Sequence, residues 1–208
     1  MTQRGKYVVI EGPDGTGKST QADLLAEHLK TLGIDSIHVK EPGGTPIGEE
    51  LRKVVLNGHL ERSPMTNLLI FTAIRHELWH NKIVPTLEQG AWVICTRNYW
   101  SSLAFQGYGE GMDIQTIARM TAEYTDSKYM HPDIGIILNF QNEAERARRI
   151  AARGALEHPD TFESRPSDFQ MRVNNAYTEI AKDYGVEVID ASKTVEEIFD
   201  YTKINLFS

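Results

Sequence analysis

Short runs rich in β-branched residues alternate with longer helical stretches, and this alternation restricts the fold more than any other feature of the chain. Each run has the length of a buried strand, and each stretch between runs can form a helix. Neighbouring parallel strands need crossover connections of that length. We therefore expect an α/β fold with a five-stranded parallel sheet flanked by helices, and ligands at the carboxyl ends of the strands. The expected strands are 7–11, 36–40, 92–96, 134–140 and 186–190. The expected helices are 18–31, 48–57, 66–81, 113–123, 143–153, 168–184 and 194–205.

Length and charge limit the other possibilities. With 208 residues, of which 40% are hydrophobic, the chain can bury one substantial core, so we expect a single domain spanning 1–208. A net charge of −7 offers no basic field for nucleic acid or an anionic membrane surface. No apolar run is long enough for a signal-peptide core or a membrane span. We therefore expect a soluble, cytoplasmic protein whose single cysteine, Cys95, is a buried and inert thiol.

A glycine-rich octapeptide lies between the first expected strand and the first expected helix, and it fits the pattern Gly-x-x-x-x-Gly-Lys-[Ser/Thr]. Its glycines allow backbone N–H groups to turn towards phosphate oxygens, and the following helix adds the positive end of its dipole. Lys18 is suited to neutralise β- and γ-phosphates, and the Ser19 hydroxyl is suited to ligate the Mg²⁺ ion that they carry. The residues expected to bind ATP are Gly12, Pro13, Asp14, Gly15, Thr16, Gly17, Lys18, Ser19 and Thr20.

The octapeptide alone does not separate kinases from other nucleotide-binding proteins. A GTPase is expected to carry Asn-Lys-x-Asp after a strand, and that tetrapeptide does not occur in the sequence. Further motifs are Glu-Pro-Gly-Gly-Thr at 41–45 with Arg52 after it, Phe71 and Arg75 four residues apart on one helix, and Thr-Arg-Asn-Tyr-Trp-Ser-Ser-Leu-Ala-Phe-Gln-Gly at 96–107. Together with the octapeptide and its acid Asp14, these motifs resemble the thymidylate kinase family over residues 7–192.

The resemblance implies a site for dTMP. Phe71 would stack on thymine while Arg75, on the same helical face, would bond the carbonyl edge of the base. Asp14 would receive the 3′-hydroxyl of the deoxyribose, and Phe105 would crowd the 2′ position. Arg97 would clamp the acceptor phosphate, because its guanidinium fork matches a phosphate bidentately. The other residues that the resemblance assigns to the substrate are Glu41, Pro42, Arg52, Ser101, Ser102 and Gln106.

The sequence departs from the family pattern on both sides of Arg97. The family usually has Asp-Arg-[Tyr/His] at this strand end, whereas this chain has Thr96-Arg97-Asn98. The missing carboxylate removes a group that is expected to organise Mg²⁺ or its waters. We expect either that Asp14 or Glu11 takes over part of that role or that turnover is slow.

Arginines gather on one face of the helix expected at 143–153. Arg146, Arg149 and Arg153 are spaced three and four residues apart, so they project from the same side. Family members without an arginine in the phosphate loop usually place the catalytic arginine in a lid. Because this chain has Gly15 in that loop, the resemblance implies Arg149 and Arg153 as candidates for that arginine.

Two segments are expected to be mobile. Residues 107–112 are rich in glycine, and residues 154–167 carry charges and two prolines without an apolar period. The expected arginine-rich lid spans about 149–167 and includes the second of these segments.

These expectations combine into a ternary site in which ATP and Mg²⁺ lie on residues 12–20 and dTMP lies between Phe71, Arg75, Arg97 and Gln106. The γ-phosphoryl group would pass from ATP to dTMP, giving dTDP and ADP, without a general base or a covalent nucleophile. The residues expected to act in catalysis are Lys18, Asp14, Arg97, Arg149 and Arg153. Three alternatives remain open: a broader deoxynucleoside monophosphate kinase, a relative that binds nucleotides without turnover, and a P-loop switch or interaction module. The resemblance also implies a homodimer.

Overall fold

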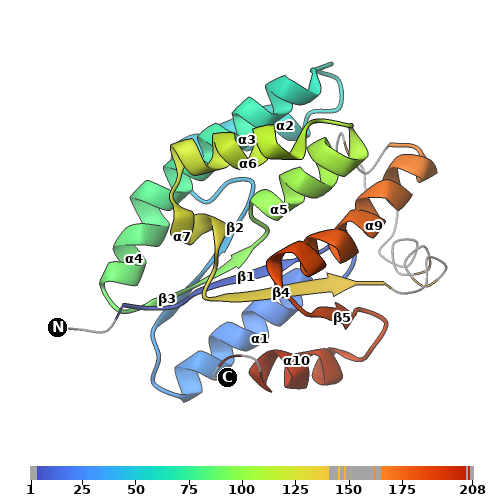
Figure 1. Cartoon of the computed structure of the whole chain (residues 1–208). Coiled ribbons are helices and arrows are strands. Elements are labelled where there is room, and N and C mark those ends of the chain that lie inside the picture. The colour runs from blue at the N-terminus through green and yellow to red at the C-terminus, as the bar shows by residue number, and fades with distance from the viewer. Residues whose placement is uncertain are drawn as a thin grey trace.

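A parallel sheet with the strand order β2-β3-β1-β4-β5 forms the centre of the molecule (Figure 1). The computed structural model describes residues 4–140, 145, 148, 162, 165–204 and 206. The strands in these ranges are β1 (Tyr7–Glu11), β2 (Ser36–Lys40), β3 (Trp92–Thr96), β4 (Ile134–Asn139) and β5 (Val188–Asp190). This architecture confirms the predicted α/β fold with a five-stranded parallel sheet.

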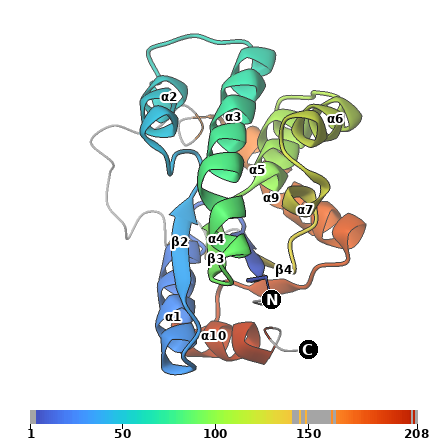
Figure 2. The same cartoon turned by 90° about the vertical axis from the view of Figure 1, so that its left-hand side faces the viewer.

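Helices cover both faces of the sheet, as Figures 1 and 2 show. Helices α1 and α10 lie on one face, while α3, α5, η2 and α9 lie on the other. The described helices are α1 (Lys18–Thr31), α2 (Pro46–Leu56), α3 (Pro64–Leu78), π-helical η1 (Trp79–Ile83), α4 (Val84–Glu88), α5 (Tyr99–Ser102), π-helical η2 (Leu103–Gly109), α6 (Ile114–Tyr124), α7 (Ser127–Met130), α9 (Ser167–Tyr184) and α10 (Val195–Ile204). In the described ranges, none of these helices is long and apolar enough to cross a membrane.

Strand β1 shows why the sheet is apolar on both sides. Val8 and Ile10 belong to the core cluster beneath α1, where they join Leu25. Tyr7 and Val9 point to the opposite cluster, because successive side chains of a strand face opposite sides of the sheet. Both faces of β1 are therefore removed from water.

The expectation that residues 107–112 are mobile is wrong for the first part of that segment. The helical run that begins with α5 continues through η2 to Gly109, and both Gly107 and Gly109 are buried. A Cβ atom at Gly109 would lie only 2.6 Å from the ring of Phe169 on α9. These glycines permit close contact between helices rather than a flexible loop.

Several element boundaries also differ from those predicted. The helix expected at 66–81 begins at Pro64, after the capping residue Ser63, and continues through η1 and α4 to Glu88. Helix α7 was not predicted; its N-cap Asp126 accepts a hydrogen bond from the backbone of Lys128. Apart from residues 145 and 148, the helix expected at 143–153 lies outside the described residues.

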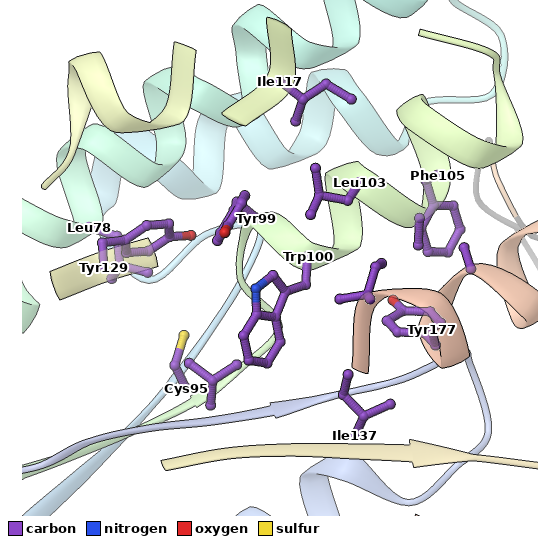
Figure 3. Packing of buried hydrophobic residues seen from close by; sticks show 14 of the residues in the cluster. Leu78, Cys95, Tyr99, Trp100, Leu103, Phe105, Ile117, Tyr129, Ile137 and Tyr177 are labelled. Atoms are coloured by element: carbon purple, nitrogen blue, oxygen red, sulfur yellow. The ribbon is translucent and has the colours of Figure 1, made fainter. Parts of the chain in front are cut away.

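Gly135 on β4 is a second position where a glycine permits close packing. A Cβ atom there would lie 2.7 Å from the ring of Trp100 and 3.0 Å from the side chain of Val186. Figure 3 shows Trp100 between the sheet and the helices above it. Gly135→Ala should lower the free energy of unfolding by about 1–3 kcal/mol through overpacking, measured by urea denaturation. The exposed control Glu27→Ala should change it by at most ~0.5 kcal/mol, and equal stability of the two variants would contradict this packing.

Candidate active site

The octapeptide forms a tight loop between the carboxyl end of β1 and the start of α1. Gly12, Gly15 and Gly17 have φ angles of 140°, 84° and 88°, which residues with a side chain rarely adopt. The Lys18 ammonium donates to the carbonyl oxygens of Gly12 and Pro13 at 2.9 and 2.6 Å. The loop thus curls around the side chain of its own lysine.

Burial changes the protonation of this lysine. It lowers the pKa of Lys18 to about 7, and the nearby positive charge of Arg97 adds to the effect, whereas Asp14 and Glu11 act against it. An anionic ligand beside Lys18 would raise this pKa and favour the ammonium form.

A cavity of about 290 Å³ opens beside the loop. Its lining residues are Asp14, Gly15, Gly17, Lys18, Ser19, Lys40, Thr96 and Arg97. Lys40 was missed in the sequence analysis, although it ends β2 and is paired in register with Thr96 at the end of β3. Burial lowers the pKa of Lys40, and the positive charges of Arg52 and Arg97 lower it further. Three cations and one carboxylate therefore surround the cavity, which suits a polyanion.

Glu11 is fully buried at the end of β1 and connects this cavity to the rest of the site. Its carboxylate accepts hydrogen bonds from the backbone N–H groups of Gly12, Asn98 and Ser101. The hydroxyl groups of Ser101 and Tyr177 also donate to it. Because these donors already surround both carboxylate oxygens, Glu11 acts as a structural anchor. These contacts leave its expected part in holding Mg²⁺ a prediction.

Arg97 lies beside this anchor in a left-handed backbone conformation, with a φ angle of 73°. Its guanidinium donates to the carboxylate of Asp14 and to the Ser101 hydroxyl, the latter at 3.0 Å. Burial alone would favour its neutral form, but Asp14, Tyr177 and Glu11 raise its pKa, so it remains a cation. A non-glycine residue in this conformation is rare, and such backbone strain is typical of functional sites.

The two residues that depart from the family pattern have distinct places. Asn98 is the N-cap of α5, and its side chain accepts a hydrogen bond from the backbone of Trp100. Thr96 lines the cavity and is 1% exposed. The first replacement therefore supports the helix that carries Ser101 and Ser102, whereas the second lies at the phosphate cavity.

Arg75 belongs to a buried chain of polar groups. Its Nε atom donates to Glu41 at 3.0 Å, and both side chains are 3% exposed. The Tyr129 hydroxyl donates to the other oxygen of Glu41 at 2.7 Å. Burial raises the pKa of Glu41, while Arg75 and Tyr129 act against that rise. Glu41 thus faces Arg75 and positions it.

The predicted pair of Phe71 and Arg75 is brought together. The guanidinium carbon of Arg75 lies 5.5 Å from the centre of the Phe71 ring. Its Nη2 atom donates to the carbonyl oxygen of Asn98 at 3.3 Å, while its Nη1 atom is buried without a hydrogen-bond partner in the part of the chain that the structure describes. A ligand carbonyl group would satisfy this donor.

The remaining predicted residues make separate contacts. Phe71 and Phe105 both contact the ring of Phe162, with ring centres 6.1 and 5.5 Å apart. The guanidinium of Arg97 lies 5.7 Å from the centre of the Phe105 ring, and Arg52 Nη1 donates to the carbonyl oxygen of Pro42. Ser102 on α5 and Gln106 on η2 are buried. The lid arginines Arg146, Arg149 and Arg153 lie outside the described residues.

Tyr129 is a positioning residue that the sequence analysis did not single out. Tyr129→Phe keeps the ring, which Figure 3 shows near Tyr99, but removes the donor to the buried Glu41 carboxylate. We expect the free energy of unfolding to fall by about 1–3 kcal/mol in a urea titration. Tyr108→Phe, on the exposed surface of η2, is the matched control and should leave stability unchanged. A wild-type midpoint for Tyr129→Phe would show that this hydrogen bond is dispensable.

Comparisons with known proteins identify the family of the chain. The thymidylate kinase family profile matches residues 10–201. The thymidylate kinase of Carboxydothermus hydrogenoformans is 35% identical over 196 residues, 94% of each chain. That of Ruthia magnifica is 37% identical over 207 residues, 98% of each chain. The crystal structure of thymidylate kinase from Ehrlichia chaffeensis superposes with a TM-score of 0.76 at 28% identity, covering 97% of this chain and 98% of that one. The chain therefore belongs to the thymidylate kinase family.

Proposed function

We propose that this protein transfers the γ-phosphoryl group of ATP to dTMP, giving dTDP and ADP. Membership of the thymidylate kinase family supports the reaction. The position of Arg97 carries the argument from the structure, because this residue lines the phosphate cavity and also contacts the Phe105 ring. The next residue, Asn98, accepts a hydrogen bond from Arg75. The donor and acceptor subsites therefore meet at two consecutive residues.

On the donor side, residues 12–20 bind the triphosphate of ATP. Backbone N–H groups of the loop and the Lys18 ammonium neutralise the phosphates, and the start of α1 adds its dipole. The Ser19 hydroxyl, exposed at the cavity, holds a Mg²⁺ ion whose charge offsets that of the β- and γ-phosphates. Within the described ranges, no group of three His, Cys, Asp or Glu side chains could hold a metal ion. The ion therefore depends on the phosphate oxygens of ATP as well as on this hydroxyl.

On the acceptor side, Phe71 stacks on the thymine ring. The Nη1 atom of Arg75, which has no hydrogen-bond partner among the described residues, donates to a base carbonyl. Ser102 and Gln106 are proposed to contact the base, and Asp14 and Phe105 the deoxyribose. Arg52 and Arg97 are proposed to bind the acceptor phosphate. Glu41, Pro42 and Ser101 are proposed to support these groups. The contacts of Glu41 and Ser101 favour support over direct contact, since their side chains already bond Arg75, Arg97 and Glu11.

Catalysis requires two anions to be held in line. The acceptor phosphate is already nucleophilic, so no protein base is needed. Arg97 exchanges its bond to Asp14 for the acceptor phosphate, and Lys18 stabilises charge on the donor phosphates. Arg149 and Arg153, which lie outside the described residues, are proposed to complete this neutralisation from the lid.

The protein is further proposed to act as a homodimer. Exposed apolar side chains occur on three neighbouring helices, with Val54 on α2, Leu69 on α3 and Tyr124 on α6. A second copy of the chain would cover these side chains.

A panel of acceptors tests the proposed reaction. ADP formation from ATP and Mg²⁺ should be fastest with dTMP when dUMP, dCMP, dGMP, dAMP and UMP are compared in parallel. Lys18→Ala should abolish turnover, because phosphate charge loses its central partner, whereas the exposed control Lys30→Ala on α1 should retain it. Similar rates across the panel would favour a broader kinase. Binding of dTMP without turnover would favour a catalytically impaired relative, and activity in Lys18→Ala would contradict the loop assignment.

The pKa of Lys18 predicts proton uptake on ATP binding. Since this pKa is about 7 in the empty site, the amine is mostly neutral at about pH 8.5, and phosphate oxygens will restore the ammonium. Calorimetry in two buffers of different ionisation enthalpy should show uptake of close to one proton at about pH 8.5 and much less at about pH 6. ATP affinity should accordingly fall as the pH rises above about 7. Lys18→Arg, whose guanidinium stays charged, should show no uptake, and buffer-independent heats for the wild type would refute the linkage.

A further inference from the structure

Three side chains from three elements form a hydrogen-bonded chain that ends at the phosphate cavity. The Nδ1 atom of His38 on β2 lies 3.0 Å from a carboxylate oxygen of Asp23 on α1. Its Nε2 atom lies 3.3 Å from the hydroxyl oxygen of Thr96. Thr96 is almost fully buried and lines the cavity, whereas the His38 side chain is 25% exposed. This series of hydrogen bonds therefore connects the surface of α1 with the wall of the cavity.

The chemistry of these groups determines where the Thr96 proton points. An ionised carboxylate can only accept, so the hydrogen on His38 must be on Nδ1, facing Asp23. In the neutral ring, Nε2 is then an acceptor and receives the Thr96 proton. In the charged ring, Nε2 donates to Thr96, whose proton then has the carbonyl oxygen of Val39 as its acceptor at 3.5 Å. With His38 Nε2 or the Val39 carbonyl oxygen as its acceptor, the hydroxyl proton points away from the cavity.

We propose that Asp23 and His38 are positioning residues that make Thr96 a fixed hydrogen-bond acceptor in the phosphate cavity, where it holds a water molecule bound to the divalent cation of the nucleotide. This role rests on the proposed function. Phosphate oxygens are themselves acceptors, so a hydroxyl oxygen that offers only lone pairs cannot bond them. It selects a donor instead, and water bound to a cation is a strong donor.

The other cationic donors in the cavity are less suited to this acceptor. Lys18 already donates to two carbonyl oxygens of the loop, and Arg97 donates to Asp14 and Ser101. Lys40, at the neighbouring register position, is the competing donor. A bond from Lys40 would not depend on the divalent cation, which makes cation dependence the deciding property. The hydrogen bonds from Asp23 through His38 to Thr96 also give position 96 a fixed acceptor in place of a carboxylate.

Calorimetric titration of ATP, once with Mg²⁺ and once with EDTA, tests the role. The measured quantity is the ratio of the dissociation constant in EDTA to that in Mg²⁺. Thr96→Val and His38→Phe should each lower this ratio about three- to tenfold, the loss expected for one hydrogen bond, while affinity in EDTA stays near wild type. Thr96→Ser retains the hydroxyl and should preserve the ratio. The double variant should lose no more than Thr96→Val alone, because His38 acts through Thr96.

His28→Phe is the matched control, since His28 lies on α1 against the ring of Phe199 rather than at the cavity. Its ratio should equal that of the wild type. Thermal melting of each variant establishes that it is folded, and Thr96→Ser keeps the test valid if Thr96→Val does not fold. An unchanged ratio in Thr96→Val or His38→Phe, equal losses in EDTA, or additive losses in the double variant would overturn the role of this chain while leaving the proposed kinase intact. Failure of the wild type to bind ATP would overturn both.

Discussion

The buried carboxylate of Glu11 determines how the parts of the site are placed relative to one another. It receives hydrogen bonds from the first glycine of the phosphate loop, from the turn after β3, and from Tyr177 on α9, which is 166 residues away in the sequence. An ionised carboxylate removed from water is costly unless it is fully paired, so these three segments must assemble together. The glycine-rich loop and the segment that carries Arg97 are therefore fixed to the same group, which sets the separation of the two proposed subsites.

Around this anchor, the site is electrostatically incomplete without its ligands. Lys18, Lys40 and Arg97 face one cavity, and among the described residues that line it Asp14 is the only carboxylate. Burial lowers the pKa of both lysines, and the positive charge of Arg97 adds to that effect. A polyanionic ligand would raise both pKa values again, because negative charge favours the ammonium forms.

The sequence allowed the sheet, the phosphate loop and the family to be predicted because each depends on local pattern. Strand β1 has an uninterrupted apolar run, and the octapeptide needs only correct spacing. The pairing of Phe71 with Arg75 followed from helical periodicity. Contacts made by the fold were not predictable in this way: Tyr129 meets Glu41 across 88 residues and His38 meets Thr96 across 58. The glycine-rich sequence of η2 is also typical of a loop. Its helical form depends on packing against α9, which the sequence alone does not indicate. The roles assigned to individual site residues remain predictions.

The environment of Cys95 has a practical consequence for labelling experiments. This thiol is the single cysteine of the chain, is fully buried in β3, and donates to the carbonyl oxygen of Arg97. Burial raises its pKa well above the usual range, so the reactive thiolate is scarce as well as inaccessible. A cysteine introduced at an exposed position would therefore be the one readily alkylated thiol. Fluorescent or spin probes could be attached at chosen sites without first removing the native cysteine.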